Sequence, residues 1–231
     1  MEAYERIFCA LDTVDLETAI NVAKKLKGLI GGVKLGKEFF TANGPAGIAA
    51  INQLKIPVFL DLKFHDIPNT VSGAIRALTG TGCTMTTIHA SGGPAMIRAA
   101  VKSRGSSKIK ILAVTVLTSL SEDDMASIGQ KGPIHEQVLR LAKMAVENGA
   151  DGIVASPLEV PILRSELGSN FTIVVPGIRP SWTTSDDQKR TMTPTEAVSS
   201  GADFLVIGRP ITEAENPEEA AALITHEIKT I

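Results

Sequence analysis

Two carboxylates and one ammonium lie close together in the segment Asp61-Leu-Lys63-Phe-His-Asp66. Residues 56–63 are largely apolar, with a proline near their start, and this pattern predicts a strand. Alternate side chains of a strand share a face, so Phe59, Asp61 and Lys63 are expected on one side. Ionised groups on an otherwise apolar face are costly unless they are paired. The pair is therefore either a structural ion pair that closes one end of the fold or part of an acid–base site.

Asp66, the third charged residue, has a second interpretation of its own. Pro68 suits the first turn of a helix, so Asp66 is either the N-cap of that helix or a member of the site. The choice depends on which other polar residues the fold brings to the same place.

The bulk composition restricts the class of protein. The chain has 231 residues, a formal net charge of −2 and a hydrophobic fraction of 44 %. This balance gives no sign of a nucleic-acid partner, and no apolar run is long enough to span a bilayer. A strand is expected within about six residues of the start, which leaves no room for a targeting peptide.

The cysteines and histidines show no metal spacing. Cys9 and Cys83 have apolar neighbours and predict buried free thiols of a reducing compartment, so we expect a cytoplasmic protein. The four histidines are scattered, and no pair has the spacing of a zinc site. The sequence therefore predicts no metal.

Strand-like and helix-like segments alternate along the whole chain. The expected strands are residues 6–12, 32–36, 57–63, 84–89, 109–117, 152–155, 172–175 and 204–207. Amphipathic stretches lie between them, and several are expected to end at a glycine. Eight strand–helix units without a linker predict one α/β domain, a (β/α)8 TIM barrel over residues 1–231. The alternative is an open doubly wound sheet, which usually carries a glycine-rich turn after its first strand; residues 10–14 contain no glycine.

The unusual polar residues fall at the carboxyl ends of the expected strands. They are Asp12, Lys34, Asp61, Lys63, His89, Thr118, Arg179 and Arg209. TIM barrels carry out their chemistry at this face, because the strands are rigid and the loops that follow them are adaptable. One such residue would mean little, whereas a ring of them predicts a site.

The turn Gly208-Arg209-Pro210 after the last expected strand has the features of a phosphate site. Gly208 allows close approach of the backbone, the backbone N–H groups can donate, and the guanidinium of Arg209 adds charge. The loops after strands seven and eight usually hold phosphate in these barrels. Arg179 on the adjacent loop is either a second phosphate ligand or a solvent-exposed arginine. Residues 176–193 around it form either a lid or a disordered loop.

Two further residues near this face are left without a role. His89 is either an acid–base group or a histidine held by hydrogen bonds in the barrel, and it stays outside the catalytic set. Trp182 is either a contact of the lid or a packed side chain.

In these motifs the chain resembles the orotidine 5′-phosphate decarboxylase family, whose members convert orotidine 5′-monophosphate (OMP) to uridine 5′-monophosphate (UMP). The segment Asp61-Leu-Lys-Phe-His-Asp-Ile-Pro-Asn-Thr70 resembles the family signature D-x-K-x-x-D-I-x-x-T. Further motifs resemble the bacterial branch in the same order: Ala10-Leu-Asp12, Val33-Lys34-Leu-Gly36, His89-Ala-Ser-Gly-Gly93, Val116-Leu-Thr118-Ser119, Pro176-Gly-Ile-Arg179-Pro180 and Gly208-Arg209-Pro210. The D-x-K-x-x-D core alone is shared with sugar-phosphate decarboxylases and synthases, and the context of Thr118, Arg179 and Gln188 narrows the resemblance to the pyrimidine branch.

The resemblance implies a catalytic set of Lys63, Asp61, Asp66 and Lys34. Lys63 would donate the proton to C6 of the pyrimidine, and Asp61 would face the substrate carboxylate. Lys34 and Asp12 would hold the ribose hydroxyls. The family also implies that the reaction uses no cofactor.

The resemblance assigns the remaining residues to the base, the phosphate and a second subunit. Thr118 would read the pyrimidine. The phosphate and the lid would be held by Gln188, Gly208, Arg209 and Arg179. The family is homodimeric, and Asp66, Ile67 and Thr70 would reach across the interface into the neighbouring site.

The residue types suit such a decarboxylation. Loss of CO2 from C6 leaves a carbanion in the ring plane, which the π system delocalises poorly. The sequence contains no pyridoxal or thiamin motif, so the protein itself has to stabilise that charge. An ammonium beside C6 does so and then transfers its proton, and the carboxylates of Asp61 and Asp66 favour the charged form of Lys63.

Three other activities remain open from the sequence. A 3-keto-gulonate-phosphate decarboxylase or a hexulose-phosphate synthase would form an enediolate with the help of a metal, so chelators would distinguish it. An aldolase would use Lys63 as a Schiff-base nucleophile, which the neighbouring carboxylates disfavour. A non-catalytic sugar-phosphate sensor would bind its ligand without turnover.

Overall fold

Eight parallel strands close into a barrel in chain order, and β1 pairs with both β2 and β8. The computed structural model describes residues 1–130, 132–183 and 191–229. Its strands are β1 (Ile7–Ala10), β2 (Gly32–Leu35), β3 (Val58–Phe64), β4 (Met85–His89), β5 (Lys110–Val114), β6 (Gly152–Val154), β7 (Thr172–Val175) and β8 (Phe204–Ile207). The TIM-barrel prediction is confirmed, and the alternative of an open doubly wound sheet is wrong.

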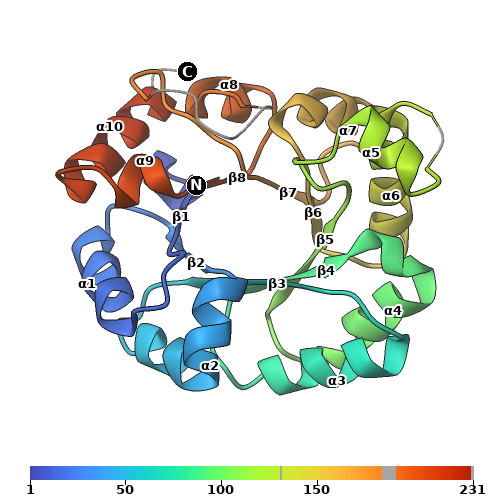
Figure 1. Ribbon diagram of the computed structural model, residues 1–231, viewed down its shortest axis with the longest axis horizontal. Helices are drawn as coiled ribbons and strands as arrows, with labels where there is room; N and C mark the ends of the chain where they lie inside the picture. Colours follow the sequence, from blue (N-terminus) through green and yellow to red (C-terminus); the bar gives the residue numbers. More distant parts are fainter. Residues whose placement is uncertain (131, 184–190, 230–231) are drawn as a thin grey trace.

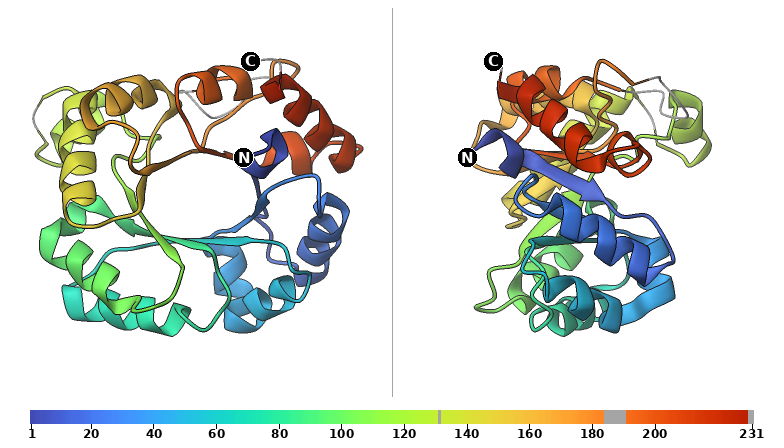
Figure 2. Two further views of the ribbon diagram at one scale, coloured as in Figure 1. Left: turned by 180° about the vertical axis from the view of Figure 1, so that it is seen from behind. Right: turned by 90° about the vertical axis from the view of Figure 1, so that its left-hand side faces the viewer.

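Helices form a ring outside the strands (Figure 1). They are α1 (Leu16–Leu26), α2 (Lys37–Asn52), α3 (Pro68–Leu78), α4 (Gly93–Ser103), α5 (Glu122–Ser127), α6 (Ile134–Glu147), α7 (Val160–Leu167), α8 (Pro194–Ser199), α9 (Arg209–Thr212) and α10 (Pro217–Lys229). Short 3₁₀ helices span Ala3–Arg6, Ala90–Gly92 and Pro157–Glu159. The view from behind shows the same ring of helices around the strands (Figure 2).

Helix α1 shows how the local sequence sets an element of this ring. The carboxylate of Asp15 accepts a hydrogen bond from the N–H of Thr18 at 2.8 Å and caps the first turn. Ala19, Ala23 and Leu26 are buried against the strands, at the spacing of one helix face. The chain then turns at Gly28, whose φ of 85° favours glycine.

The barrel has one apolar layer inside the strands and another between the strands and the helices. The inner layer consists of Phe8, Phe59, Met85, Leu112 and Val174. The ring of Phe8 meets those of Phe59 and Phe204 edge-on, with centroids 6.2 and 5.4 Å apart. Asp61 and Thr87 follow Phe59 and Met85 by two residues on their strands, so the polar interior starts directly above this layer.

Several predicted strands run past the carboxyl ends of the observed strands, and the largest excess is at β5. The predicted strand 109–117 ends at Val114 as β5, although the N–H of Thr115 still donates to the carbonyl of Val154 at 3.2 Å. Beyond that bond the chain leaves the sheet and Leu117 is 37 % exposed. The apolar and β-branched residues of the sequence therefore continue to Leu117, although the hydrogen bonds of strand β5 end earlier. Strand β3, by contrast, extends one residue further than predicted, to Phe64.

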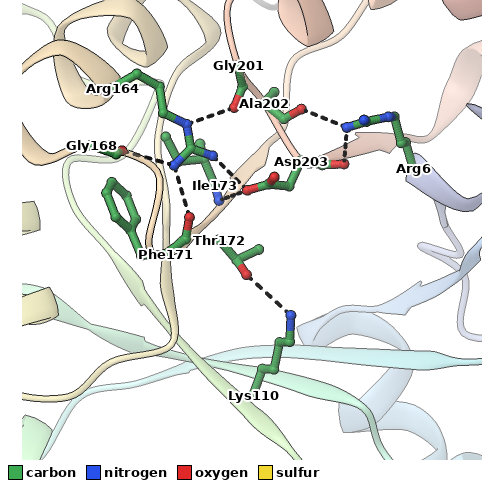
Figure 3. A network of polar contacts seen from close by, with 10 residues as sticks. All are labelled: Arg6, Lys110, Arg164, Gly168, Phe171, Thr172, Ile173, Gly201, Ala202 and Asp203. Carbon is green, nitrogen blue, oxygen red and sulfur yellow. Dashed lines mark hydrogen bonds and ion pairs between the residues drawn. The ribbon is translucent and has the colours of Figure 1, made fainter. Parts of the chain in front are cut away.

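Polar contacts close the amino-terminal end of the barrel between β7 and β8 (Figure 3). The guanidinium of Arg164 lies 2.7 Å from the carboxylate of Asp203, which also accepts from the N–H of Ile173 at 2.7 Å. Arg164 donates in addition to the carbonyls of Gly201 and Phe171, each at 2.9 Å. This end of a TIM barrel contributes stability, whereas the opposite end carries the chemistry.

The described part of the chain contains no helix that is long and apolar enough to cross a bilayer. Cys9 and Cys83 are buried free thiols, as predicted. Burial, with a further contribution from Asp12, raises the pKa of the Cys9 thiol to about 12, so this thiol is unreactive at neutral pH.

Candidate active site

A cavity of about 260 Å³ opens at the carboxyl-terminal end of the barrel. Its polar lining consists of Asp12, Lys34, Asp61, Lys63, Arg179 and Arg209, together with the backbone of Gly208. Its apolar lining includes Phe59, Val154 and Val206. The ring of polar residues predicted from the strand ends therefore meets in one place.

Strand β3 is irregular where its two charged residues lie. Leu60 pairs with Thr86 and Phe64 pairs with Ile88, so residues 61–63 stand opposite the single residue Thr87. Lys63 takes a φ of 53°, in the left-handed region that a side chain of its kind rarely adopts. Both charged side chains line the cavity as predicted, but a bulge places them there and the regular alternation that we expected is wrong.

Within the bulge, Lys63 and Asp61 form an ion pair. Lys63 Nζ lies 2.7 Å from Asp61 Oδ2, and the two side chains are 25 % and 12 % exposed. Burial by itself raises the pKa of Asp61, but the charges of Lys63 and Lys34 and two hydrogen bonds outweigh it and hold this pKa below its ordinary value. The carboxylate is therefore ionised at neutral pH.

A second ion pair lies beside the first. Lys34 Nζ on β2 lies 3.0 Å from Asp12 Oδ1, and the lysine side chain is almost buried. A Cβ atom on Gly36 would lie 2.8 Å from Asp12 Oδ1 and 3.0 Å from Lys34 Nζ. Glycine at position 36 is therefore what leaves room for this pair.

The expected phosphate residues lie at the β7–β8 side of the cavity. Gly208 and Arg209 follow β8 directly, and Arg179 follows β7. Both arginines also line an adjoining cavity of about 340 Å³, together with Trp182. Arg179 is half-buried, so its interpretation as a solvent-exposed arginine is wrong. Gln188, the remaining predicted phosphate ligand, lies outside the described residues.

Thr118 lies outside the lining of the main cavity, in a smaller space beside it. It lines a cavity of about 150 Å³ that also touches Lys63, Val154 and Pro176. The same three residues line the main cavity, so the two spaces are neighbours. The structure thus brings the predicted base-reading residue near the predicted proton donor.

Three predicted site residues do not line the described cavities of this chain. Asp66, Ile67 and Thr70 are exposed on the surface, and Ile67 is 67 % exposed. Asp66 Oδ1 accepts from the N–H of Ile67 at 2.6 Å. The N-cap of α3 is Ile67, so the interpretation of Asp66 as the N-cap is wrong. Because they are exposed on the single chain, these residues are accessible to a second subunit.

His89 at the end of β4 packs against a second histidine. Its ring centroid lies 5.3 Å from that of His65. Burial, followed by the charges of His65, Lys63 and Lys37, lowers the pKa of His89 to about 4. Its imidazole is therefore neutral at neutral pH and stores no proton for the reaction.

Thr87 is a residue of this site that the sequence reasoning missed. Its buried hydroxyl donates to Asp61 Oδ1 at 2.8 Å and accepts from the backbone N–H of Lys63 at 2.8 Å. The available signal was its place on β4, two residues before His89 on the same face of the strand.

A larger cavity of about 690 Å³ lies at the amino-terminal end of the barrel. Phe8, Met85 and Phe204 line it, together with lysines that precede the strands. It contains none of the polar residues predicted for the site. The smaller cavity is the candidate active site, because two ion pairs meet there, and the pair of Lys63 and Asp61 is largely buried with its carboxylate ionised. Among the described residues, no three His, Cys, Asp or Glu side chains are grouped so as to hold a metal.

Comparisons with known proteins agree with this geometry. Residues 5–224 match the family model described as "Orotidine 5'-phosphate decarboxylase / HUMPS family". An orotidine 5′-phosphate decarboxylase of Paramagnetospirillum magneticum is 51 % identical, covering 96 % of this chain and 97 % of that protein. One from Trichlorobacter lovleyi is 47 % identical, covering 98 % and 96 %. The crystal structure of the Lactobacillus acidophilus orotidine 5′-phosphate decarboxylase superposes with a TM-score of 0.85 at 41 % identity, covering 96 % of this chain and 98 % of that one. The predicted family is thereby confirmed: the chain belongs to the orotidine 5′-phosphate decarboxylase family.

Proposed function

We propose that the protein decarboxylates OMP to UMP, the last step of pyrimidine nucleotide synthesis, with Lys63 protonating C6 and without a cofactor or a metal. The observation that carries the proposal is the ion pair of Lys63 and Asp61 at 2.7 Å in a cavity that the arginine-bearing loops after β7 and β8 border. The relatives are orotidine 5′-phosphate decarboxylases, which supplies the substrate class, and the chemistry of the side chains supplies the mechanism.

The pair of Asp61 and Lys63 accounts for two steps at C6, the loss of CO2 and the protonation of the carbon that remains. The substrate carboxylate lies against Asp61, whose own charge is secured by the neighbouring lysines. As CO2 leaves, the electron pair of the broken C–C bond stays on C6, and the ammonium of Lys63 stabilises it. The ammonium then gives its proton to C6 and becomes a neutral amine, which takes up a proton from solvent before the next turnover.

The ribose and the phosphate are held away from the reacting carbon. Asp12 and Lys34 offer a carboxylate and an ammonium to the ribose hydroxyls from one side of the cavity. Arg209, Arg179 and the backbone of Gly208 meet the phosphate at the other side. Gln188 is assigned to the phosphate by the same proposal. Binding energy from the phosphate then serves to orient C6 against Lys63.

Thr118 is assigned to the pyrimidine. It lines the small cavity beside Lys63, where the base has to lie if C6 is to meet the ammonium. A hydroxyl can donate to a carbonyl oxygen or accept from a ring N–H, and this pairing suits the edge of a pyrimidine.

Two copies of the chain form the complete site. Asp66 and Ile67 lie in the segment that joins β3 to α3, and Thr70 lies in the first turn of α3. None of the three is in the described lining of their own chain's cavity. Ile67 is a large apolar side chain that is 67 % exposed, and a dimer interface at this segment would bury it. In a two-fold dimer the same segment reaches from each copy toward the other.

We also propose that residues 1–231 act as one domain in the cytoplasm. Both cysteines are buried free thiols, which suits a reducing compartment. Neither the domain organisation nor the cellular location affects the proposed mechanism.

The test is the loss of OMP absorbance when purified protein is added, with and without EDTA. We expect UMP as the product and the same rate in both assays. A rate that EDTA abolishes would show that the decarboxylation of OMP depends on a metal and would contradict the proposed metal-independent mechanism. If the folded protein leaves OMP unchanged, the substrate assignment is wrong.

A further inference from the structure

A closed ring of hydrogen bonds joins Thr87 to the catalytic pair. The backbone N–H of Lys63 donates to Thr87 Oγ1 at 2.8 Å, and Thr87 Oγ1 donates to Asp61 Oδ1 at 2.8 Å. The other carboxylate oxygen, Asp61 Oδ2, accepts from Lys63 Nζ at 2.7 Å. Lys63 therefore takes part in the ring twice, once through its backbone N–H and once through its side-chain ammonium.

The direction of each hydrogen bond in the ring is determined. An amide N–H can only donate, so it occupies a lone pair of Thr87 Oγ1 and leaves the hydroxyl hydrogen available. An ionised carboxylate can only accept, so that hydrogen goes to Asp61. Thr87 is fully buried, and no competing water reaches a side chain in such a position.

The ring of hydrogen bonds lies at an irregular part of the sheet, where the pairing of β3 with β4 is interrupted. Residues 61–63 bulge against the single residue Thr87, so the ordinary ladder of backbone hydrogen bonds is interrupted there. The N–H of Lys63 finds a side chain in place of a backbone carbonyl. Lys63 also has a positive φ of 53°, a conformation that persists only where the surroundings hold it.

We propose that Thr87 is a positioning residue of the decarboxylase, whose single hydroxyl holds the β3 bulge in the shape that aligns Asp61 and Lys63 for the reaction. The inference rests on the proposed roles of Asp61 and Lys63. Thr87 is not in the described lining of the cavity, so its effect passes through the two residues it binds.

The neighbouring residue on β4 provides a matched control. Thr86 is also a fully buried threonine, but it faces the opposite side of the strand, and its hydroxyl has no hydrogen-bond partner within the described part of the chain. Thr87→Val and Thr86→Val remove the same atoms at adjacent positions of one strand. Only the first of them breaks the ring.

The decisive experiment compares kcat and KM for OMP in Thr87→Val, Thr87→Ser and Thr86→Val. We expect Thr87→Val to lower kcat by about 10- to 100-fold while KM stays nearly unchanged, because a small displacement of the catalytic pair affects the transition state most. Thr87→Ser keeps the hydroxyl and should restore most of kcat. Thr86→Val should behave like the wild type.

The pH profile separates a positioning role from a merely structural one. Loss of the donated hydrogen bond raises the pKa of Asp61, so the acid limb of kcat/KM should move to higher pH in Thr87→Val and stay in place in Thr86→Val. The charged or titratable groups that act on Asp61 include Lys63 on its own strand, Lys34 on β2 and His89 on β4. Asp12, Arg179 and Arg209 line the same cavity, and all of these groups are unchanged in both variants.

The outcomes distinguish this inference from the proposed function. If Lys63→Ala is inactive and Thr87→Val has wild-type kcat, the role of Thr87 is wrong and the mechanism stands. If Lys63→Ala stays active, the mechanism itself is wrong. If Thr87→Val does not fold, Thr87→Cys keeps a weaker donor, and its kcat should lie below that of Thr87→Ser. Equal kcat values in those two variants would overturn the inference.

Discussion

Lys63 Nζ and Asp61 Oδ2 lie 2.7 Å apart, although both residues belong to one strand and are separated only by Leu62. In a regular strand, such residues point the same way with their Cα atoms about 6.6 Å apart. The bulge in β3 and the left-handed φ of 53° at Lys63 bring the two groups together. Such a conformation costs on the order of 1–3 kcal/mol, which the ion pair and the hydrogen bonds of Thr87 offset.

Arg209 is expected to act through the phosphate of the substrate. Arg209→Ala should reduce kcat/KM for OMP by an amount equivalent to about 2–5 kcal/mol, because a charged contact in a closed site is lost. Orotidine, which lacks the phosphate, serves as the internal control and should lose much less. Steady-state kinetics on both substrates check this expectation, and equal losses would contradict a phosphate role.

A site shared between subunits predicts that two inactive variants complement each other. Lys63→Ala and Asp66→Ala should each be inactive when assayed alone. After random mixing, half of the dimers carry one variant of each kind, and one of their two sites is intact. The mixture should then recover about a quarter of the wild-type specific activity. Activity that stays at the level of the separate variants would place Asp66 outside the partner's site.

The lowered pKa of His89 predicts a dependence of stability on pH. Its pKa is 6.5 in the ordinary state and about 4 in the folded protein, chiefly through burial. Between these values the unfolded chain binds the extra proton, so this contribution to stability is complete above pH 6.5 and is lost as the pH falls toward 4. After allowance for its partial exposure, the loss is about 1–2 kcal/mol.

Urea unfolding of the wild type and of His89→Gln at pH 7 and pH 5 measures this contribution of His89 to the free energy of unfolding. The wild type should lose more stability between the two values than the variant does. The same pH dependence in both proteins would show that His89 titrates normally.

The network of Arg164 at the opposite end of the barrel should affect stability and leave catalysis alone (Figure 3). Arg164→Ala leaves the carboxylate of Asp203 without its ionic partner, at a cost of about 2–3 kcal/mol in the free energy of unfolding. Arg98→Ala, which removes an exposed arginine bonded to the side chain of Asn148, is the control. Chemical denaturation should separate the two variants, and kcat should be unchanged in both. A marked loss of kcat in Arg164→Ala would show that the two ends are coupled.

Much of the fold was predictable because the strands of a barrel are buried on both faces. All eight expected strands exist, and the polar residues at their carboxyl ends mark the cavity. The bulge in β3 was not predictable, since no glycine or asparagine marks the left-handed position that Lys63 occupies. Thr87 was missed because its two partners belong to another strand, and the register that aligns them is not visible in one sequence.

The segment after β3 shows a different limit of prediction. The charge of Asp66 suggested a member of the site, and the resemblance to the family added Ile67 and Thr70, but the fold of one chain leaves all three on its surface. Their expected role depends on contacts between two chains. No pattern within one chain reports such contacts, so only the resemblance to the family suggested them.

A comparison of two lysine variants tests whether the ammonium of Lys63 protonates C6. Lys55 and Lys63 are the non-glycine residues with positive φ among the described residues, at 56° and 53°. Lys55 is exposed near the amino-terminal end of the barrel, so Lys55→Ala removes the same charge from the same backbone conformation far from the site. We expect Lys63→Ala to lower kcat for OMP by about 10³-fold or more with the fold retained, and Lys55→Ala to keep wild-type kcat. A folded Lys63→Ala protein that turns over OMP at a rate close to that of Lys55→Ala would contradict the account.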